Sequence, residues 1–313
     1  MLSQLQSSSN QIGESTNSLS GLVVLVCALA LILDYCSISL PRSLPNLATN
    51  AADTRCGNAA TQAAYIGGIR YAISTLARRA PHANLYLDAG HGGWLGWPDK
   101  VDDFLHIISR LGAGAVAGLR GFATNVANYQ SLGVPCPASA FATGWPQLGP
   151  QYCAHHADAI CCRDPCGLLS KYNSANNELN YVQLFTSRLR RSATVSGALP
   201  NPRFIIDTGR NGNAAMRTDC SNWCNIRGAA VGVASTPETA LPDHVDAYFW
   251  LKTPGESDGC TEILPSGERC PRVRFRGRPR LPGCAVPMAP STPCPHSLLR
   301  HTEPTAWLAK CEA

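Results

Sequence analysis

Residues 1–270 of the sequence carry no net charge. The whole chain of 313 residues contains 26 Lys and Arg against 21 Asp and Glu, which gives a net charge of +5. Residues 271–313 alone contain seven Lys and Arg and two Glu, so this last segment accounts for the full excess. A protein that holds nucleic acid through its phosphates needs a basic face on its folded part. The charge distribution therefore argues against nucleic acid as a partner.

The sequence also lacks an apolar run long enough to cross a membrane comfortably. The run Leu22–Leu33 has 12 residues, whereas a membrane-spanning helix needs about 20. This length is typical of the hydrophobic part of a signal peptide, although the basic residues that normally precede it are missing. A buried β-strand fits equally well. We keep both interpretations for the N-terminal segment 1–38, with a membrane anchor through residues 22–33 as a minor alternative.

Cysteine, in contrast, is abundant, with 15 residues, which is typical of an oxidising compartment and predicts a secreted protein. The odd number leaves at least one cysteine unpaired. An irregular segment, 131–172, contains Cys136 and a group of residues of the types that bind zinc: Cys153, His155, His156, Cys161, Cys162 and Cys166. Their spacing matches no regular zinc motif, so we favour disulfides that fix this loop and expect no metal.

The spacing of apolar residues predicts helices that alternate with strands. Helices are predicted over 59–76, 102–111 and 176–191, and strands over 85–87, 116–119, 204–206 and 248–251. Such alternation is typical of α/β proteins with a parallel sheet, either open or closed into a barrel. Four polar residues come at or after the ends of strands: Asp88, Asn125, Asp207 and Lys252. Functional sites of such folds lie at the carboxyl ends of the strands, so we expect the site there.

The stretch 84–100 has the composition of a site. A predicted strand ends at Asp88, and a glycine-rich loop with His91, Trp94 and Trp97 follows it. Indole rings can pack against the C–H faces of sugar rings, while the acid and the histidine can hydrogen-bond sugar hydroxyls. Alternatively, the tryptophans close the edge of the domain, since Trp is usually well buried. On local chemistry alone the two interpretations are equally good.

Residues 271–313 differ in character from the rest. They are rich in Arg and Pro and show neither helical nor strand periodicity. We predict a disordered, solvated tail. An arm that binds a polyanion is the alternative, and nothing else in the sequence supports it.

Several motifs together resemble those of glycoside hydrolase family 6. They are Y-L-D-A-G-H-G-G-W-L-G-W-P at 86–98, L-R-G-F-A-T-N-V-A-N-Y at 119–129, D-T-G-R-N-G at 207–212, N-W-C-N at 222–225 and K-T-P-G-E-S-D-G at 252–259. The resemblance covers about residues 43–270 and implies a catalytic domain over 39–270. It also implies a distorted parallel β/α barrel, incomplete at its N-terminal part, which hydrolyses β-1,4-glucan such as cellulose with inversion. We expect a monomer without a cofactor.

The resemblance assigns roles to individual residues. Asp258 matches the proposed catalytic base, and Arg210 and Lys252 match its charged partners. Two nearby cations keep a carboxylate ionised and fix its position, which a base that activates water requires. Without the family context, these three residues would be interpreted as an ordinary salt-bridge network.

Substrate contacts follow in the same way. Trp94 and Trp97 match sugar-stacking residues on the leaving-group side, and Trp223 matches one on the other side. The positions that match hydroxyl-binding residues are Asp88, His91, Asn128, Lys252 and Glu256. Asp88 is equally well explained as a carboxylate that braces its own loop. Cys224 matches a cysteine that forms a disulfide in the family, with Cys270 as a candidate partner.

The sequence departs from the family at the general acid. The family has an Asp in the motif E-P-D-S-L-x-N-L, whereas this chain has Arg42 at that position. An arginine stays protonated and cannot deliver a proton to the leaving oxygen. The upstream part of the family's barrel and the continuation after residue 272 also have no counterpart. Altered reading frames or misplaced exon boundaries at both ends are our hypothesis for this. We therefore expect very low activity, with a non-catalytic glucan-binding protein as the alternative.

Overall fold

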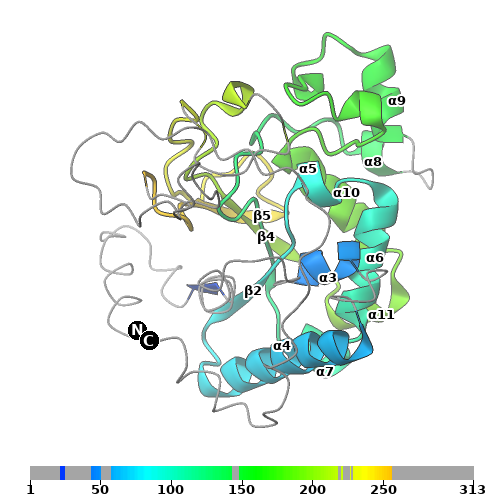
Figure 1. Cartoon of the computed structure of the whole chain (residues 1–313), viewed down its shortest axis with the longest axis vertical. Helices are drawn as coiled ribbons and strands as arrows, with labels where there is room; N and C mark the ends of the chain where they lie inside the picture. Colours follow the sequence, from blue (N-terminus) through cyan, green and yellow to red (C-terminus); the bar gives the residue numbers. More distant parts are fainter. Residues whose placement is uncertain are drawn as a thin grey trace, which may run out of the picture.

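Five parallel strands form one sheet in the computed structural model of the chain (Figure 1). The structure describes residues 22–24, 44–50, 58–142, 148–217, 220, 226 and 228–255. The strands are β1 (Leu22–Val24), β2 (Asn84–Asp88), β3 (Gly121–Thr124), β4 (Arg203–Asp207) and β5 (Val245–Phe249), and they lie side by side in chain order. This order is that of a β/α barrel and not of a doubly wound sheet, whose strand order reverses.

Helices connect the strands and gather mainly on one side of the sheet (Figure 1). They are α3 (Leu44–Asn50), α4 (Ala59–Arg79), α5 (Gly92–Leu95), α6 (Pro98–Ser109), α7 (Ala113–Val116), α8 (Ser139–Ala142), α9 (Leu148–His155), α10 (Glu178–Leu189) and α11 (Ala193–Ala198), with short 3₁₀ turns η1 (Ile160–Cys162), η2 (Leu169–Lys171) and η3 (Ala214–Met216). Local chemistry defines two of the long helices. Asn58 caps α4 by accepting a hydrogen bond from Thr61 N, and Asn177 caps α10 by accepting one from Asn180 N.

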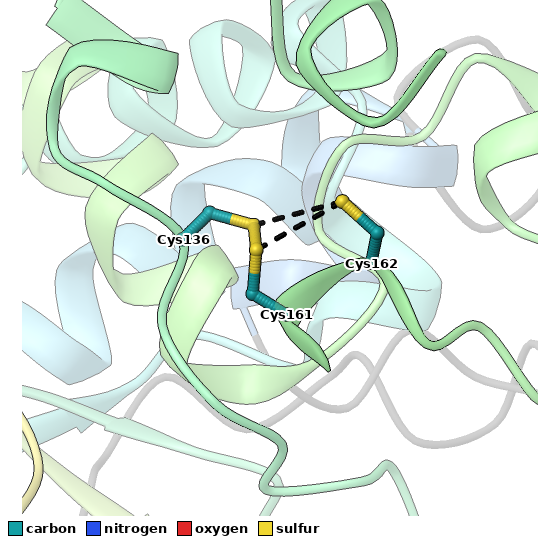
Figure 2. Close-up of side chains that lie close together, drawn as sticks. All are labelled: Cys136, Cys161 and Cys162. Carbon is teal, nitrogen blue, oxygen red and sulfur yellow. Dashed lines mark hydrogen bonds between the residues drawn. A yellow bond between two sulfur atoms is a disulfide. The ribbon is translucent and has the colours of Figure 1, made fainter. Parts of the chain in front are cut away.

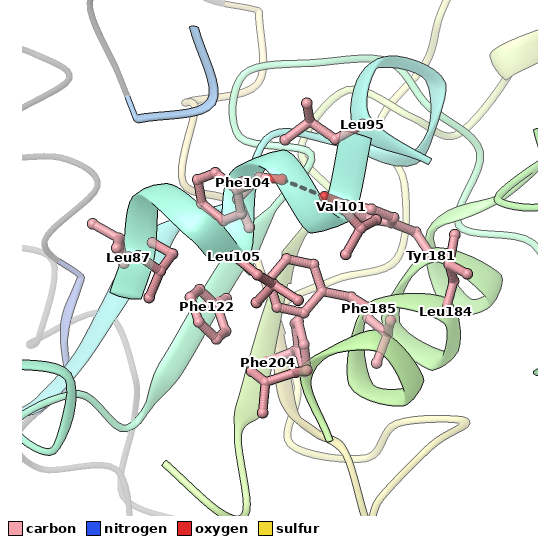
Figure 3. Packing of buried hydrophobic residues seen from close by; sticks show 14 of the residues in the cluster. Leu87, Leu95, Val101, Phe104, Leu105, Phe122, Tyr181, Leu184, Phe185 and Phe204 are labelled. Carbon is pink, nitrogen blue, oxygen red and sulfur yellow. Dashed lines mark hydrogen bonds between the residues drawn. The ribbon is translucent and has the colours of Figure 1, made fainter. Parts of the chain in front are cut away.

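Four phenylalanines form the centre of the core between the sheet and its helices (Figure 3). Phe122 on β3 and Phe204 on β4 meet Phe104 on α6 and Phe185 on α10, and all four side chains are fully buried. Phe122 and Phe185 are closest, with ring centroids 4.8 Å apart. The other face of the sheet carries a second, smaller apolar cluster, which is built on Tyr86, Ala123, Ile205 and Ala247. Successive side chains of each strand therefore point to opposite faces of the sheet, as expected for a pleated strand.

A charged network closes the amino-terminal end of the sheet. The Asp246 carboxylate accepts hydrogen bonds from Arg120 Nε at 2.9 Å, Arg203 Nε at 2.7 Å and the Tyr86 hydroxyl at 2.5 Å. Burial raises the pKa of Asp246, but these hydrogen bonds outweigh burial and lower it overall. Because this end of a parallel sheet lies opposite the usual site, we interpret the network as a structural clamp.

The structure corrects one predicted strand and shifts another. The prediction of a strand over 116–119 is wrong: α7 ends at Val116, and the strand begins at Gly121. A run of four apolar residues fits either structure, and here Val116 and Leu119 pack into the core from a helical turn. Strand β5 is displaced toward the N-terminus from the predicted 248–251.

The apolar run near the N-terminus contributes a strand. Residues Leu22–Val24 form β1 and pair in parallel with β2, which favours the strand interpretation for these three residues. The rest of this run, most of segment 1–38 and the whole tail 271–313 lie outside the described residues. Among the helices that the structure describes, none combines the length and the apolar character needed to cross a membrane.

Removal of the Phe185 ring tests the central role of the phenylalanine cluster. We expect Phe185→Ala to lower the free energy of unfolding by about 3–5 kcal/mol, since it leaves a cavity between β3, β4 and α6. Urea unfolding followed by fluorescence measures this loss. Tyr71→Ala on α4 is the matched control, because Tyr71 is 62% exposed, and we expect a change within about 0.5 kcal/mol. A loss of less than about 1 kcal/mol for Phe185→Ala would contradict the packing described.

Candidate functional site

The carboxylate of Asp207 joins three loops at the carboxyl end of the sheet. Its Oδ2 accepts hydrogen bonds from Ala127 N at 2.9 Å and from Lys252 N at 3.0 Å, and its Oδ1 accepts one from Gly209 N at 2.8 Å. These donors belong to the loops that follow β3, β5 and β4, respectively. Burial raises the pKa of Asp207, while the three hydrogen bonds and the Arg210 charge oppose this effect. The site is therefore built around a buried structural acid.

Asn125 shapes the loop after β3. Its side-chain oxygen accepts a hydrogen bond from Gln130 N at 3.0 Å, and its amide donates to the Asp207 carbonyl at 2.9 Å. Asn125 and Ala127 have φ values of 58° and 53°. Left-handed backbone is uncommon in residues other than glycine, and such strain gathers at functional sites. The loop is thus held in a strained form by hydrogen bonds that Asn125 Nδ2 and Ala127 N donate to Asp207 at the end of the neighbouring strand.

The two predicted cations lie beside this acid. Arg210 is 6% exposed, and its guanidinium carbon lies 4.3 Å from the centroid of the Tyr129 ring. Its Nη2 also donates a hydrogen bond to the Ala127 carbonyl. These contacts fix the guanidinium through a cation–π interaction and a loop carbonyl. The backbone of Lys252 is fixed by Asp207, so Arg210 and Lys252 emerge from the two loops that Asp207 binds together.

The tryptophan loop after β2 forms a second part of the same edge. Asp88 Oδ1 accepts a hydrogen bond from Gly90 N at 2.9 Å, so Asp88 does brace its own loop. Helix α5 then begins after His91 and carries Trp94, whose ring centroid lies 6.2 Å from that of His91. Trp97 donates a hydrogen bond from Nε1 to the Lys171 carbonyl at 2.8 Å. Both tryptophans are half-buried, which leaves part of each indole at the surface.

A buried carboxyl group lies beneath this loop. Glu178, at the start of α10, is fully buried, and its Oε1 accepts a hydrogen bond from Gly92 N at 2.8 Å. Burial raises the pKa of Glu178, and the hydrogen bonds and the charge of nearby Arg217 oppose this effect only in part. The net pKa is about 7. Burial and Arg217 lower the pKa of His91, so its imidazole is neutral at neutral pH. Neither Glu178 nor Arg217 was predicted as a site residue. For Glu178 the reason is that an acid in the first turn of a helix is ordinary.

Three disulfides fix the irregular segment next to the tryptophan loop. They are Cys136–Cys161, Cys153–Cys162 and Cys166–Cys220. The Cys162 sulfur also lies 4.0 Å from that of Cys136 and 3.8 Å from that of Cys161 (Figure 2). Their sulfurs are close enough to hold a metal ion, but each of them is bonded to another cysteine. The disulfide interpretation of this segment is therefore confirmed.

Asparagines at the start of α10 attach this segment to the core. The Asn176 amide donates to the Cys161 carbonyl at 2.9 Å, and Asn180 Oδ1 accepts from Cys136 N at 2.8 Å. In Figure 1 the segment with α8 and α9 lies at the end of the molecule where α5 meets α10. The segment thus borders the tryptophan loop.

The structure brings together part of the predicted site. Asn128 lies on the loop after β3, where its Oδ1 accepts a hydrogen bond from Tyr129 N at 2.7 Å. Its predicted contact with sugar hydroxyls, like those of Asp88, His91 and Lys252, stays a prediction. The remaining predicted residues lie outside the described part of the chain: Arg42, Trp223, Cys224, Glu256, Asp258 and Cys270.

These features define an α/β protein whose polar and aromatic site lies at the carboxyl edge of a parallel sheet. The chain belongs to the glycosyl hydrolases family 6, whose sequence model matches residues 32–146 and 161–270. The family predicted from the motifs is therefore confirmed.

Individual relatives agree with this assignment. The 1,4-β-D-glucan cellobiohydrolase CEL6C of Podospora anserina is 37% identical over 224 residues, which are 71% of this chain and 47% of that protein. The catalytic core domain of the cellobiohydrolase Cel6A from Chaetomium thermophilum matches with a TM-score of 0.52 and 31% identity, over 73% of this chain and 53% of that chain. Cel6A of Humicola insolens, solved in complex with glucose and cellotetraose, has a TM-score of 0.52, 28% identity and the same coverage.

The solved relatives confirm the predicted fold class, an α/β fold with the parallel sheet of the distorted family 6 barrel. The chain spans about half the length of the relatives that it matches. Residues 147–160, which include all of α9 and Cys153, are not matched by the family's sequence model.

The raised pKa of Glu178 predicts a measurable pH dependence of stability. Its carboxyl group titrates near 4.5 in the unfolded chain and about 7 in the folded one, so the folded state binds the extra proton between these values. Its contribution to the free energy of unfolding is therefore greatest below pH 4.5 and is lost as the pH rises to 7. We expect Glu178→Gln to match the wild type near pH 4 and to be more stable by up to about 3 kcal/mol at pH 8.

Urea unfolding from pH 4 to pH 8 measures this difference. The His91 shift acts in the opposite direction, since a lowered pKa removes stability as the pH falls below 6.5. It is common to both proteins and cancels when they are compared. Glu238→Gln is the control, because Glu238 is exposed. A difference between Glu178→Gln and the wild type that does not change with pH would contradict the buried acid.

Proposed function

We propose that this chain binds β-1,4-glucan at the carboxyl edge of its sheet and hydrolyses it, with inversion, at a strongly reduced rate. The observation that carries the proposal is the position of two half-buried tryptophans at the same edge as Arg210 and Lys252. Indole faces suit the apolar faces of sugar rings, and the neighbouring polar groups suit hydroxyls. The relatives named cellobiohydrolases, and the complex of one relative with cellotetraose, support this ligand class.

The proposed reaction uses Asp258 as the base that activates water. Arg210 and Lys252 emerge from loops that Asp207 fixes, and this geometry suits cations that orient a third group. Two nearby positive charges keep a carboxylate ionised at the pH of the reaction. Trp94 and Trp97 would hold the leaving-group side of the chain, and Trp223 the other side, while Asp88, His91, Asn128 and Glu256 would bind hydroxyls.

The reduced rate follows from the residue at position 42. Inversion needs an acid that protonates the leaving oxygen, and Arg42 stands where the family has its Asp. Loss of general acid assistance costs roughly 10²–10⁴-fold. The alternative function is that of a glucan-binding protein without catalysis. Arg42 also favours this alternative, in which the same tryptophans would bind the glucan.

We propose that the protein acts outside the cell. Three disulfides fix the segment beside the site, and such bonds persist in oxidising compartments. The residues described include no metal ligand set other than cysteines already joined in disulfides.

Hydrolysis of amorphous cellulose, with reducing ends as the readout, tests the proposed function. We expect this chain to turn over roughly 10²–10⁴-fold more slowly than a family member with the general acid. Turnover at the rate of such a member would contradict the role given to Arg42. No turnover together with clear binding would favour the alternative.

Calorimetric titration with cellotetraose, under the same conditions, supplies the binding measurement. Trp97→Ala should weaken binding by about tenfold or more, because truncation of a central Trp in a binding surface typically costs at least 1–2 kcal/mol. Tyr71→Ala, an exposed aromatic residue on α4, is the matched control and should bind as the wild type does. The absence of binding to any cello-oligosaccharide would refute both functions.

A further inference from the structure

Tyr172 combines strong exposure with a strained backbone. Its side chain is 74% exposed, and its φ of 58° and ψ of 25° are left-handed. Residues with a Cβ atom adopt this conformation at a cost, which glycine avoids. An exposed ring recovers little of that cost through packing. Folding stability therefore does not account for tyrosine at this position, and strain of this kind is typical of binding sites.

The position of Tyr172 places it beside the tryptophan loop. The carbonyl of Lys171, the residue before it, accepts the hydrogen bond from Trp97 Nε1 at 2.8 Å. On its other side, Asn173 donates from Nδ2 to the Gly92 carbonyl at 2.8 Å. The Lys171 carbonyl and the Asn173 side chain therefore attach the chain on both sides of Tyr172 to the loop that carries Trp94 and Trp97. The Lys171 carbonyl that accepts from the Trp97 indole belongs to the peptide group bonded to the Tyr172 nitrogen.

The turn that presents Tyr172 is held in place independently of any ligand. Tyr172 N donates to the Leu169 carbonyl at 3.0 Å, and Asn173 N donates to the Leu168 carbonyl at 3.0 Å. Asp164 Oδ2 accepts a hydrogen bond from Leu169 N at 2.7 Å. The disulfide Cys166–Cys220 then fixes the start of the turn. The backbone that carries the ring is therefore ordered before a ligand binds, which lowers the entropic cost of binding.

We propose that Tyr172 forms an additional sugar-binding position next to Trp97, at the end of the surface that begins at Trp94. The inference rests on the proposed function, and its ligand is a β-1,4-glucan chain that extends past Trp97. A tyrosine ring offers an apolar face for a sugar ring and a hydroxyl for its polar groups. The flanking Ser170 and Lys171 are exposed and polar, which suits a hydrated polysaccharide better than an apolar protein surface.

The experiment compares Tyr172→Gly with the wild type in calorimetric titrations of cello-oligosaccharides of increasing length, from cellotriose to cellohexaose. Glycine removes the ring and also relieves the backbone strain, so the variant should unfold at an equal or higher urea concentration. We expect its affinity for the longest oligosaccharide to fall about tenfold or more, as for a central aromatic contact, while its affinity for cellotriose stays unchanged. Tyr172→Phe should bind nearly as the wild type does.

The controls separate this inference from the proposed function. Tyr71→Gly would damage helix α4, so Tyr71→Ala is the exposed aromatic control, and it should bind all lengths as the wild type does. Equal affinity of Tyr172→Gly and the wild type at every length would overturn the additional position and leave the proposed function intact. An equal loss at all lengths would also overturn it, because it would mean that Tyr172 acts only by positioning Trp97. No binding by the wild type would overturn both.

Discussion

The site depends on one buried carboxylate that accepts hydrogen bonds from three loops. Asp207 is 2% exposed, and its two oxygens accept from the backbone nitrogens of Ala127, Gly209 and Lys252. Hydrogen bonds to a charged acceptor are among the strongest in proteins, and their loss would leave three donors without partners in the interior. The strained loop after β3 and the loops that carry Arg210 and Lys252 keep their relative positions for this reason.

The two ends of the sheet use charge in different ways. At the amino-terminal end, Asp246 is surrounded by Arg120, Arg203 and the Tyr86 hydroxyl, so its charge is neutralised by side chains. At the carboxyl end, Asp207 is held mainly by backbone nitrogens. Arg210 and Lys252 there extend from the two loops that this acid fixes. The network around Asp246 stabilises the sheet, whereas the hydrogen bonds to Asp207 fix the loops that form the candidate site.

Local sequence patterns predicted the strongly periodic elements but not their tertiary contacts. Helices α4 and α10 and strands β2 and β4 were found within a few residues, because their apolar spacing is regular. The four apolar residues at 116–119 fit either structure, and burial in a helical turn decided between them. The motifs identified the tryptophan loop, and the positions of polar residues after strands placed Asp207 at this edge without assigning it a role. They could not identify Glu178, whose partner Gly92 lies 86 residues away, since no local pattern encodes that contact.

We propose that the carboxyl edge of the sheet binds glucan and that its chemistry is limited at position 42. The tryptophan loop, the disulfide-fixed segment and the cationic loops meet at that edge, whereas Arg42 cannot supply the proton that inversion requires. The most direct measurement is a crystal structure of the protein soaked with cellotetraose. We predict intact sugar rings over Trp94 and Trp97 at the carboxyl ends of β2 to β5. A ligand bound elsewhere, or a site that stays without sugar at millimolar cellotetraose, would contradict glucan binding at this edge.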